Sequence, residues 1–214
     1  MARPPPPVPA PCRTLRVFVS ESRQPAVDGR RRLVGRTGTM EREGRAGPAM
    51  TVYAYVEGPL GEMLLVGEPT ADGTLLASLS LPGQKGGAVV REGWRHAPEA
   101  FEEIAGQLAA YFAGRLTRFD IPWAGGAGTE FQRRVWRALE DIPYGETVTY
   151  GEIAARVGAP GAGVRAVGTA IGRNPLLVVR PCHRVIGADG ALRGYAGGLE
   201  RKERLLGLEG ALAP

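Results

Sequence analysis

The pattern of apolar and polar residues changes abruptly at Met50. Three runs rich in β-branched, aromatic and aliphatic residues follow, over 51–56, 63–66 and 75–81. Turn residues separate them, a Gly-Pro-Leu-Gly sequence after the first run and an Asp-Gly pair after the second. Runs of this kind bounded by such turns are typical of β-hairpins. The pattern therefore predicts an antiparallel meander of three strands.

A single helix is predicted to cover this sheet. Gln84–Arg95 is a Gly-rich loop, and Pro98 then stands where the first residue of a helix is expected. Gly114 ends the periodic pattern. The apolar residues between them recur at helical spacing and are Phe101, Ile104, Ala105, Leu108, Tyr111 and Phe112.

The second half of the chain is mostly helical in its periodicity. Thr129 and Thr149 each begin a capping box, completed by Gln or Glu three residues later. Further helices are predicted over 164–173 and after Gly198. Because the two helices that follow Thr149 are joined by a Gly-containing turn, they have the layout of a helix-turn-helix.

An apolar run, Leu176–Val179, leads into the sequence Pro-Cys-His-Arg-Val at 181–185. We interpret this run as a short strand, and the Asp-Gly pair at 189–190 as the turn of a hairpin.

The chain divides into three parts. Residues 1–49 hold 8 of the 18 prolines and lack apolar periodicity apart from 17–19, so they cannot bury enough surface to offset their ordering entropy. We interpret them as a disordered leader. We favour Met50 as the true start over an Arg-rich transit peptide or a nucleic-acid-binding arm. Residues 50–122 and 128–210 are then the two domains of an α+β protein.

Composition and charge exclude several classes of protein. The net charge is +5, but residues 1–49 carry +6, and 121–214 carry +3, so a polyanion would meet the C-terminal part of the folded chain. No stretch has the ~20 uninterrupted apolar residues that cross a bilayer. Two cysteines and two histidines are too few for a disulfide framework, a four-cysteine zinc site or a His-rich metal centre. We therefore expect a reducing intracellular location and no metal.

Cys182 and His183 are the strongest candidates for chemistry. A free thiol is mostly protonated at neutral pH and needs a nearby base or positive field to become a nucleophile. His183 and Arg184 beside it could provide both. The alternative is an inert, buried cysteine. Pro181, which rigidifies the approach, favours the reactive interpretation.

The helix over 164–173 is unusually rich in small residues. Gly168 and Gly172 lie inside it, although glycine in a helix costs ~1 kcal/mol relative to alanine. We interpret them as a place where another backbone comes close, either a core helix or a nucleic acid, with Arg165 projecting alone. The segment 161–166 matches G-x-G-x-x-A, but a helix precedes it, so a dinucleotide site is rejected.

Five sequence motifs in the second half of the chain resemble those of a known protein family. GTEFQRRVWRAL, IPYGETVTYGEIA, VRAVGTAIGRNP, PCHRVIG and GYAGGLERKERLL follow one another over Gly128–Gly210. In this order they resemble the O6-alkylguanine-DNA alkyltransferases, the methylated-DNA–protein-cysteine methyltransferases. Residues 50–122 match that family in layout only, and 1–49 match nothing in it. The resemblance implies irreversible, stoichiometric transfer of an alkyl group from O6 of guanine, or O4 of thymine, to Cys182.

The resemblance also implies a role for each site residue. Cys182 is the alkyl acceptor, His183 takes its proton through a water, and Glu209 orients the imidazole. Asn174 ties the recognition helix to the active-site turn. Tyr150 hydrogen-bonds the flipped guanine. Backbone groups of three more residues line the guanine pocket, namely Val185, Tyr195 and Ala196.

The implied DNA-binding residues lie on one helix. Arg165 fills the stack that the base has left, Ala166 packs against the minor groove, and Gly168 completes this surface. The expected partner is double-stranded DNA containing alkylated bases. The family further implies a ribonuclease H-like first domain, a winged-helix-like second domain, and a cytoplasmic monomer without cofactor or membrane attachment. With only Cys12 and His96 in the first 122 residues, the zinc site of some members is not expected.

Three other functions remain open on the sequence alone. A non-catalytic alkyltransferase-like lesion-binding protein would have Trp in place of Cys182. A winged-helix regulatory protein would share the helix-turn-helix and hairpin but have no use for the Pro-Cys-His-Arg sequence. A Cys-His-Glu hydrolase would need an oxyanion-hole motif, which is not recognisable here.

Overall fold

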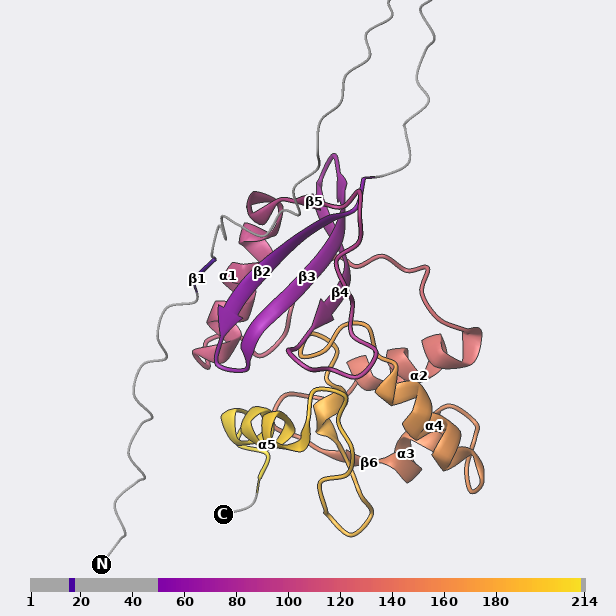
Figure 1. Cartoon of the computed structure of the whole chain (residues 1–214). Helices are drawn as coiled ribbons and strands as arrows, with labels where there is room; N and C mark the ends of the chain where they lie inside the picture. Colours follow the sequence, from indigo (N-terminus) through magenta and orange to yellow (C-terminus); the bar gives the residue numbers. More distant parts are fainter. Residues whose placement is uncertain (1–15, 18–49, 213–214) are drawn as a thin grey trace, which may run out of the picture.

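The computed structural model describes residues 16–17 and 50–212 (Figure 1). Along the chain the elements are β1 (Arg16–Val17), β2 (Val52–Gly58), β3 (Gly61–Thr70), β4 (Gly73–Ser80), β5 (Arg95–His96), the 3₁₀ turn η1 (Pro98–Phe101), α1 (Glu102–Phe112), α2 (Glu130–Glu140), β6 (Val148–Thr149), α3 (Tyr150–Arg156), α4 (Gly163–Gly172), the 3₁₀ turn η2 (Cys182–Arg184), β7 (Val185–Ile186) and α5 (Leu199–Leu208). The sheet and α1 form one half of the molecule, and α2 to α5 form the other (Figure 1). The α+β class is confirmed.

The predicted meander is present as β2, β3 and β4, paired antiparallel in that order. β5 adds a short parallel pairing to the outer edge of β2. The backbone of Arg16–Val17 pairs antiparallel with the other end of that edge. The rest of the predicted disordered leader lies outside the described residues.

The linker, residues 121–128, connects the two halves and runs along the edge of β4 that faces away from β3. The N–H of Leu76 donates to the carbonyl of Pro122 (2.8 Å), and the N–H of Ala124 donates to the carbonyl of Leu76 (3.1 Å). The segment that joins the two halves is therefore hydrogen-bonded to the edge of the sheet.

The active-site segment uses the same edge of β4 further along. The N–H of Leu79 donates to the carbonyl of Pro175 (2.9 Å), and the N–H of Leu177 donates to the carbonyl of Leu79 (3.2 Å). Beyond this single bridge, Leu176–Val179 folds as buried turns, so the prediction of a strand there was wrong. The apolar character of the run reflects burial between the two halves and not β-structure.

Both predicted capping boxes are formed. Thr129 Oγ1 accepts from the N–H of Gln132, and the side chain of Gln132 accepts from the N–H of Thr129. Thr149 and Glu152 make the same pair of bonds at the start of α3. One hydrophobic core then runs through both halves of the molecule.

The prediction of a hairpin at 189–190 needs correction. A turn is present, since the N–H of Gly187 donates to the carbonyl of Ala191 (2.9 Å). However, β7 pairs in parallel with β6, and the described chain has no strand after β7. The ribonuclease H-like and winged-helix-like descriptions stay predictions. No helix in the described ranges is long and apolar enough to cross a membrane.

Gly67 offers a test of the sheet's packing. It lies at a register shift in β3, where an added Cβ would stand 2.6 Å from a methyl carbon of Thr74 and 2.8 Å from the carbonyl of Leu75. Gly67→Ala should therefore lower the free energy of unfolding in urea by about 1–3 kcal/mol, the usual effect of overpacking. The matched variant Gly106→Ala, at an exposed position of α1 with open space around it, should raise it by up to ~1 kcal/mol. Equal effects at the two positions would show that β3 is not tightly packed at Gly67.

Candidate active site

Cys182 follows a loop with unusual backbone geometry. The N–H of Val179 donates to the carbonyl of Leu177 (2.8 Å), and the N–H of Cys182 donates to the carbonyl of Arg180 (2.7 Å), so two γ-turns follow one another. Val178, at the centre of the first, has φ of 70° and is the one non-glycine residue with positive φ in the described ranges. Such strain costs about 1–3 kcal/mol and persists only where the surroundings fix it.

The side chain of Asn174 fixes this loop. Its Nδ2 lies 3.2 Å from each of three acceptors, the carbonyls of Leu176 and Arg180 and the Sγ of Cys182. Its Oδ1 accepts from the N–H of Leu176 (3.0 Å). One buried amide thus ties both ends of the strained loop and reaches the thiol. Asn174 is the second residue after α4, so its side chain connects the end of that helix to the active-site loop.

The thiol of Cys182 is almost completely buried, with 3% of the residue exposed. Burial raises the pKa of Cys182 to about 11, although Asn174, Lys202 and Arg180 each act to lower it. The thiol of the free protein is therefore protonated at neutral pH. Its ionisation must accompany the binding of a substrate or the transfer of its proton to a base.

His183 and Glu209 form a buried pair beside this thiol. The Nε2 of His183 lies 2.9 Å from Oε1 of Glu209, and both side chains are fully buried. Burial lowers the pKa of His183, despite the opposing effect of Glu209, so the imidazole is neutral. Since an ionised carboxylate only accepts hydrogen bonds, Nε2 carries the hydrogen and Nδ1 the free lone pair. That Nδ1 is buried and has no hydrogen-bond partner among the described residues.

Tyr111 and Arg184 also donate to Glu209 and keep it ionised, in addition to Nε2 of His183. Tyr111 Oη donates to Oε1 (2.6 Å), and Arg184 donates through Nε to Oε2 and through Nη2 to Oε1 (2.9 Å each). Burial alone would raise the pKa of Glu209, but the hydrogen bonds from His183 and Arg184 outweigh it and lower the pKa to about 2. Tyr111 belongs to α1, so the first half of the molecule contributes directly to this network.

A buried lysine organises the predicted base pocket. Lys202 Nζ donates to the carbonyl of Val185 and to that of Arg193 (2.7 Å), and it stands 5.9 Å from the ring centre of Tyr150. Burial lowers the pKa of Lys202 to about 8. Tyr150 Oη lies 3.3 Å from the carbonyl of Gly194. The structure thus brings Tyr150 and Val185 together around one ammonium group.

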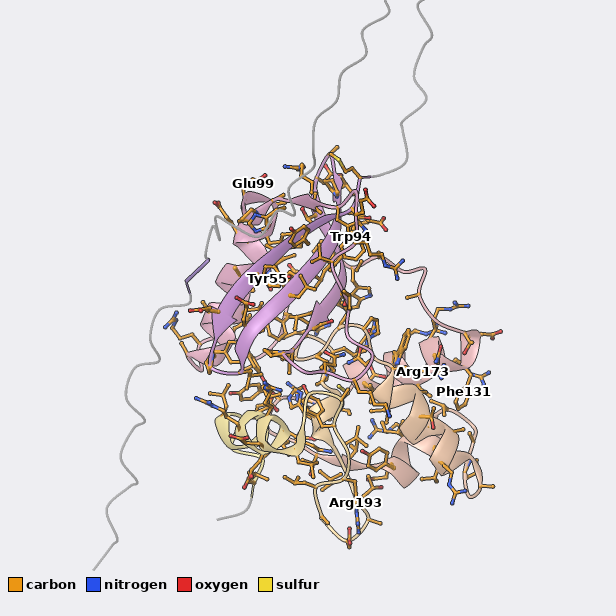
Figure 2. The ribbon with its side chains drawn as sticks, viewed as in Figure 1. Tyr55, Trp94, Glu99, Phe131, Arg173 and Arg193 are labelled. Atoms are coloured by element: carbon orange, nitrogen blue, oxygen red, sulfur yellow. The ribbon has the colours of Figure 1, made fainter. Side chains whose placement is uncertain are left out.

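The other two predicted pocket residues lie on the loop that follows β7. Tyr195 and Ala196 are half-buried and pack against the hydrophobic core. Burial, and then the neighbouring Cys182, raise the pKa of Tyr195 well above its ordinary value. Arg193 stands at the exposed tip of the same loop (Figure 2).

The predicted DNA-binding residues lie on α4. Arg165 and Ala166 are exposed, as is Arg173, which caps the end of the helix (Figure 2). At Gly168 an added Cβ would lie 3.8 Å from the Tyr150 ring, which is ordinary contact with a side chain. At Gly172 nothing lies within 4 Å. No other backbone lies within 4 Å of an added Cβ at either glycine, so the alternative that the backbone of a core helix comes close was wrong. The approach of a nucleic acid to these positions stays a prediction.

Comparisons with known proteins agree with this geometry. Residues 130–211 match the family described as the DNA-binding domain of 6-O-methylguanine DNA methyltransferase. A methylated-DNA–protein-cysteine methyltransferase of Mycolicibacterium paratuberculosis is 52% identical over 165 residues, covering 77% of this chain and 96% of the relative. The chain belongs to this family. A second methyltransferase of the same name, from Methanosarcina acetivorans, is 50% identical over 74% of this chain and 98% of its own length.

Solved structures of the family share the fold. Mycobacterium tuberculosis OGT in complex with DNA is 48% identical, with a TM-score of 0.66 over 76% of this chain and 95% of that one. The O6-methylguanine-DNA methyltransferase of Pyrococcus kodakaraensis, at 22% identity and a TM-score of 0.54, shows the fold alone.

Sequence reasoning missed part of the site. The helical pattern places Tyr111 on an apolar face, and nothing local indicates that its hydroxyl reaches Glu209. The sequence indicates Arg184 only as a source of positive charge near the thiol, and not as a donor to Glu209. The sequence does hint at a special role for Lys202, because it is one of only two lysines among 27 basic residues.

The ionised state of Glu209 predicts an acid-dependent loss of stability. Because folding lowers its pKa from 4.5 to about 2, the network stabilises the folded state fully above pH 4.5, and this contribution is lost as the pH falls toward 2. In urea unfolding at several pH values, Glu209→Gln should be much less stable than the parent near pH 7, and the difference should shrink between pH 4.5 and 2. Glu203→Gln, at an exposed position of the same helix, is the control and should follow the parent. A difference for Glu209→Gln that is constant with pH would contradict the assignment.

Proposed function

We propose that Cys182 is the alkyl acceptor in the direct-reversal repair of alkylated DNA by this chain. The observation that carries the proposal is one buried thiol that contacts Nδ2 of Asn174 (3.2 Å) and directly precedes the buried His183–Glu209 pair in the chain, with the charge of Lys202 near enough to favour its ionisation. A lesion-binding protein needs no nucleophile, and a winged-helix regulator needs no buried base beside one.

The chemistry follows from the site. The S–H bond of Cys182 breaks, and its proton passes through a bridging water to Nδ1 of His183. The sulfur forms a bond to the alkyl carbon as the bond from that carbon to O6 of guanine breaks. The electron pair remains on the guanine, where Tyr150 Oη is the available donor. Burial raises the pKa of Tyr150, which keeps this donor protonated. The product is a thioether, so each molecule of protein reacts once.

The reaction requires the base to leave the helix. An O6 substituent lies inside the duplex, and flipping the nucleotide out costs a few kcal/mol. The exposed face of α4 is suited to that step, because Arg165 projects from a surface of small residues. In this proposal Arg165 fills the vacated stack, Ala166 and Gly168 let the DNA backbone approach, and Val185, Tyr195 and Ala196 receive the base. The proposed partner is double-stranded DNA, bound by a cytoplasmic monomer without a cofactor. The solved complex of the M. tuberculosis relative with DNA supports DNA as the partner.

Mass spectrometry tests the acceptor. Incubation with duplex DNA containing O6-methylguanine should add a single methyl to the peptide that carries Cys182, with one equivalent transferred per protein. Cys182→Ser should bind the DNA without transfer, and Cys12→Ala should transfer as the parent does. Multiple turnovers, transfer to Cys12, or binding without transfer by the parent would each overturn the proposal.

The methylated protein should be less stable than the parent. Sγ is buried and lies 3.2 Å from Nδ2 of Asn174, so an added methyl has to displace that contact. Extra carbon atoms in a packed site typically cost about 1–3 kcal/mol. Thermal unfolding before and after reaction should show a lower midpoint for the methylated form. Identical midpoints would show that the site accommodates the methyl without strain.

A further inference from the structure

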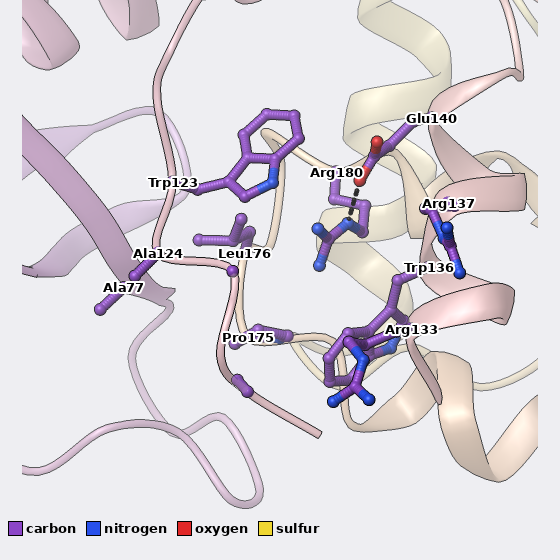
Figure 3. Close-up of a pocket in the computed structure, with 12 residues that line it drawn as sticks. Ala77, Trp123, Ala124, Arg133, Trp136, Arg137, Glu140, Pro175, Leu176 and Arg180 are labelled. Carbon is purple, nitrogen blue, oxygen red and sulfur yellow. Dashed lines mark hydrogen bonds and ion pairs between the residues drawn. The ribbon is translucent and has the colours of Figure 1, made fainter. Parts of the chain in front are cut away.

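Arg180 is a buried cation with a fixed position. It is 7% exposed and lies on the wall of a cavity of about 350 Å³ between the linker and α2. Its guanidinium stands 5.5 Å from the ring centre of Trp123 and 5.3 Å from that of Trp136. Its Nε donates to Oε1 of Glu140 (2.8 Å; Figure 3). Two aromatic faces and one carboxylate therefore leave the planar group little freedom.

The same guanidinium reaches the active site. Its Nη1 lies 3.4 Å from Oδ1 of Asn174, and Nδ2 of that amide lies 3.2 Å from Sγ of Cys182. The N–H of Leu176 also donates to this Oδ1 (3.0 Å), and the two donors together keep Nδ2 of the amide facing the sulfur. A continuous chain of contacts thus runs from Glu140 on α2 to Cys182.

We propose that Arg180 is a positioning residue for alkyl transfer, which orients Asn174 against the sulfur of Cys182 and places a fixed positive charge beside it. The inference rests on the proposed role of Cys182 as acceptor. Its role is distinct from that of the His183–Glu209 pair, which receives the proton, because Arg180 influences the sulfur through Asn174 and through its charge.

The charge of Arg180 favours ionisation of the Cys182 sulfur. Desolvation opposes ionisation of Cys182, and Arg180 is one of the groups that favour it. Besides Arg180, the charged or titratable groups that interact with the thiol are Lys202, Tyr150 and Tyr195. His183 follows the thiol in the chain and pairs with Glu209, and Arg201 acts on Tyr195. Among the described residues, the side chain of Arg180 hydrogen-bonds Glu140 and Asn174 and none of these six groups.

The test is the pH profile of the thiol in the full chain. In a Cys12→Ala background, the rate of alkylation of Cys182 by iodoacetamide is measured against pH, and the midpoint of the rise is compared between variants. Arg180→Met should move the midpoint up by about 0.5–1 pH unit, and lower the rate at neutral pH about three- to tenfold. Arg180→Lys, which keeps the charge, should restore most of the rate.

Two further variants distinguish this role from one in which Arg180 only stabilises the fold. Glu140→Gln removes the carboxylate that compensates Arg180 and should move the midpoint down, opposite to Arg180→Met. Arg137→Met, an exposed cation on the wall of the same cavity, should leave the midpoint unchanged. If Arg180→Met lowers the melting temperature without moving the midpoint, or if Arg180→Met and Glu140→Gln shift it in the same direction, the proposal is wrong.

Methyl transfer from DNA completes the experiment. If the parent transfers methyl to Cys182 but Arg180→Met transfers at the parent's rate across the pH range, only the role of Arg180 fails. If the parent itself does not transfer, the proposed function fails, whatever the iodoacetamide profile shows.

Discussion

The side-chain amide of Asn174 is the interaction on which the site depends. It is 1% exposed, and it binds the backbone on both sides of a turn that holds Val178 in the left-handed region. Among the described residues no other side chain bonds both ends of this loop, so the amide is its side-chain restraint, in addition to the bond from the N–H of Arg180 to the carbonyl of Leu176. The position of the Cys182 sulfur is therefore a property of the amide and the loop together. A nucleophile placed in this way needs little reorganisation when a substrate arrives.

Burial and hydrogen bonding have opposite effects on the ionisation of the groups in the site. Burial keeps the Cys182 thiol protonated. In the same buried site, hydrogen bonds from Arg184 and Tyr111 keep Glu209 ionised. A buried charge is tolerated only when it is paired and hydrogen-bonded, and Glu209 meets both conditions. The protein thus stores one stable negative charge beside a neutral imidazole. That arrangement leaves His183 ready to receive a proton without ionising the sulfur in advance.

Local patterns predicted the elements well and the loops poorly. Capping boxes at Thr129 and Thr149 fixed the starts of α2 and α3, because each depends on residues only three apart. The run 176–179 reads as a strand, yet its burial comes from contact with β4 and the second half, which no local pattern contains. The motif around Cys182 pointed to the nucleophile and its base. The contributions of Tyr111, 98 residues before Glu209, and of Arg180 depend on how distant segments meet.

The shared edge of β4 has a consequence for the molecule as a whole. Strand edges that are left open act as templates for pairing with other chains. Here Leu76 and Leu79 donate and accept along that edge with the linker and the active-site segment, while β1 and β5 occupy the outer edge of β2. A fragment that ended before residue 122 would expose the β4 edge along much of its length. Self-association of such a fragment would follow from the same hydrogen-bonding groups that join the two halves in the intact protein.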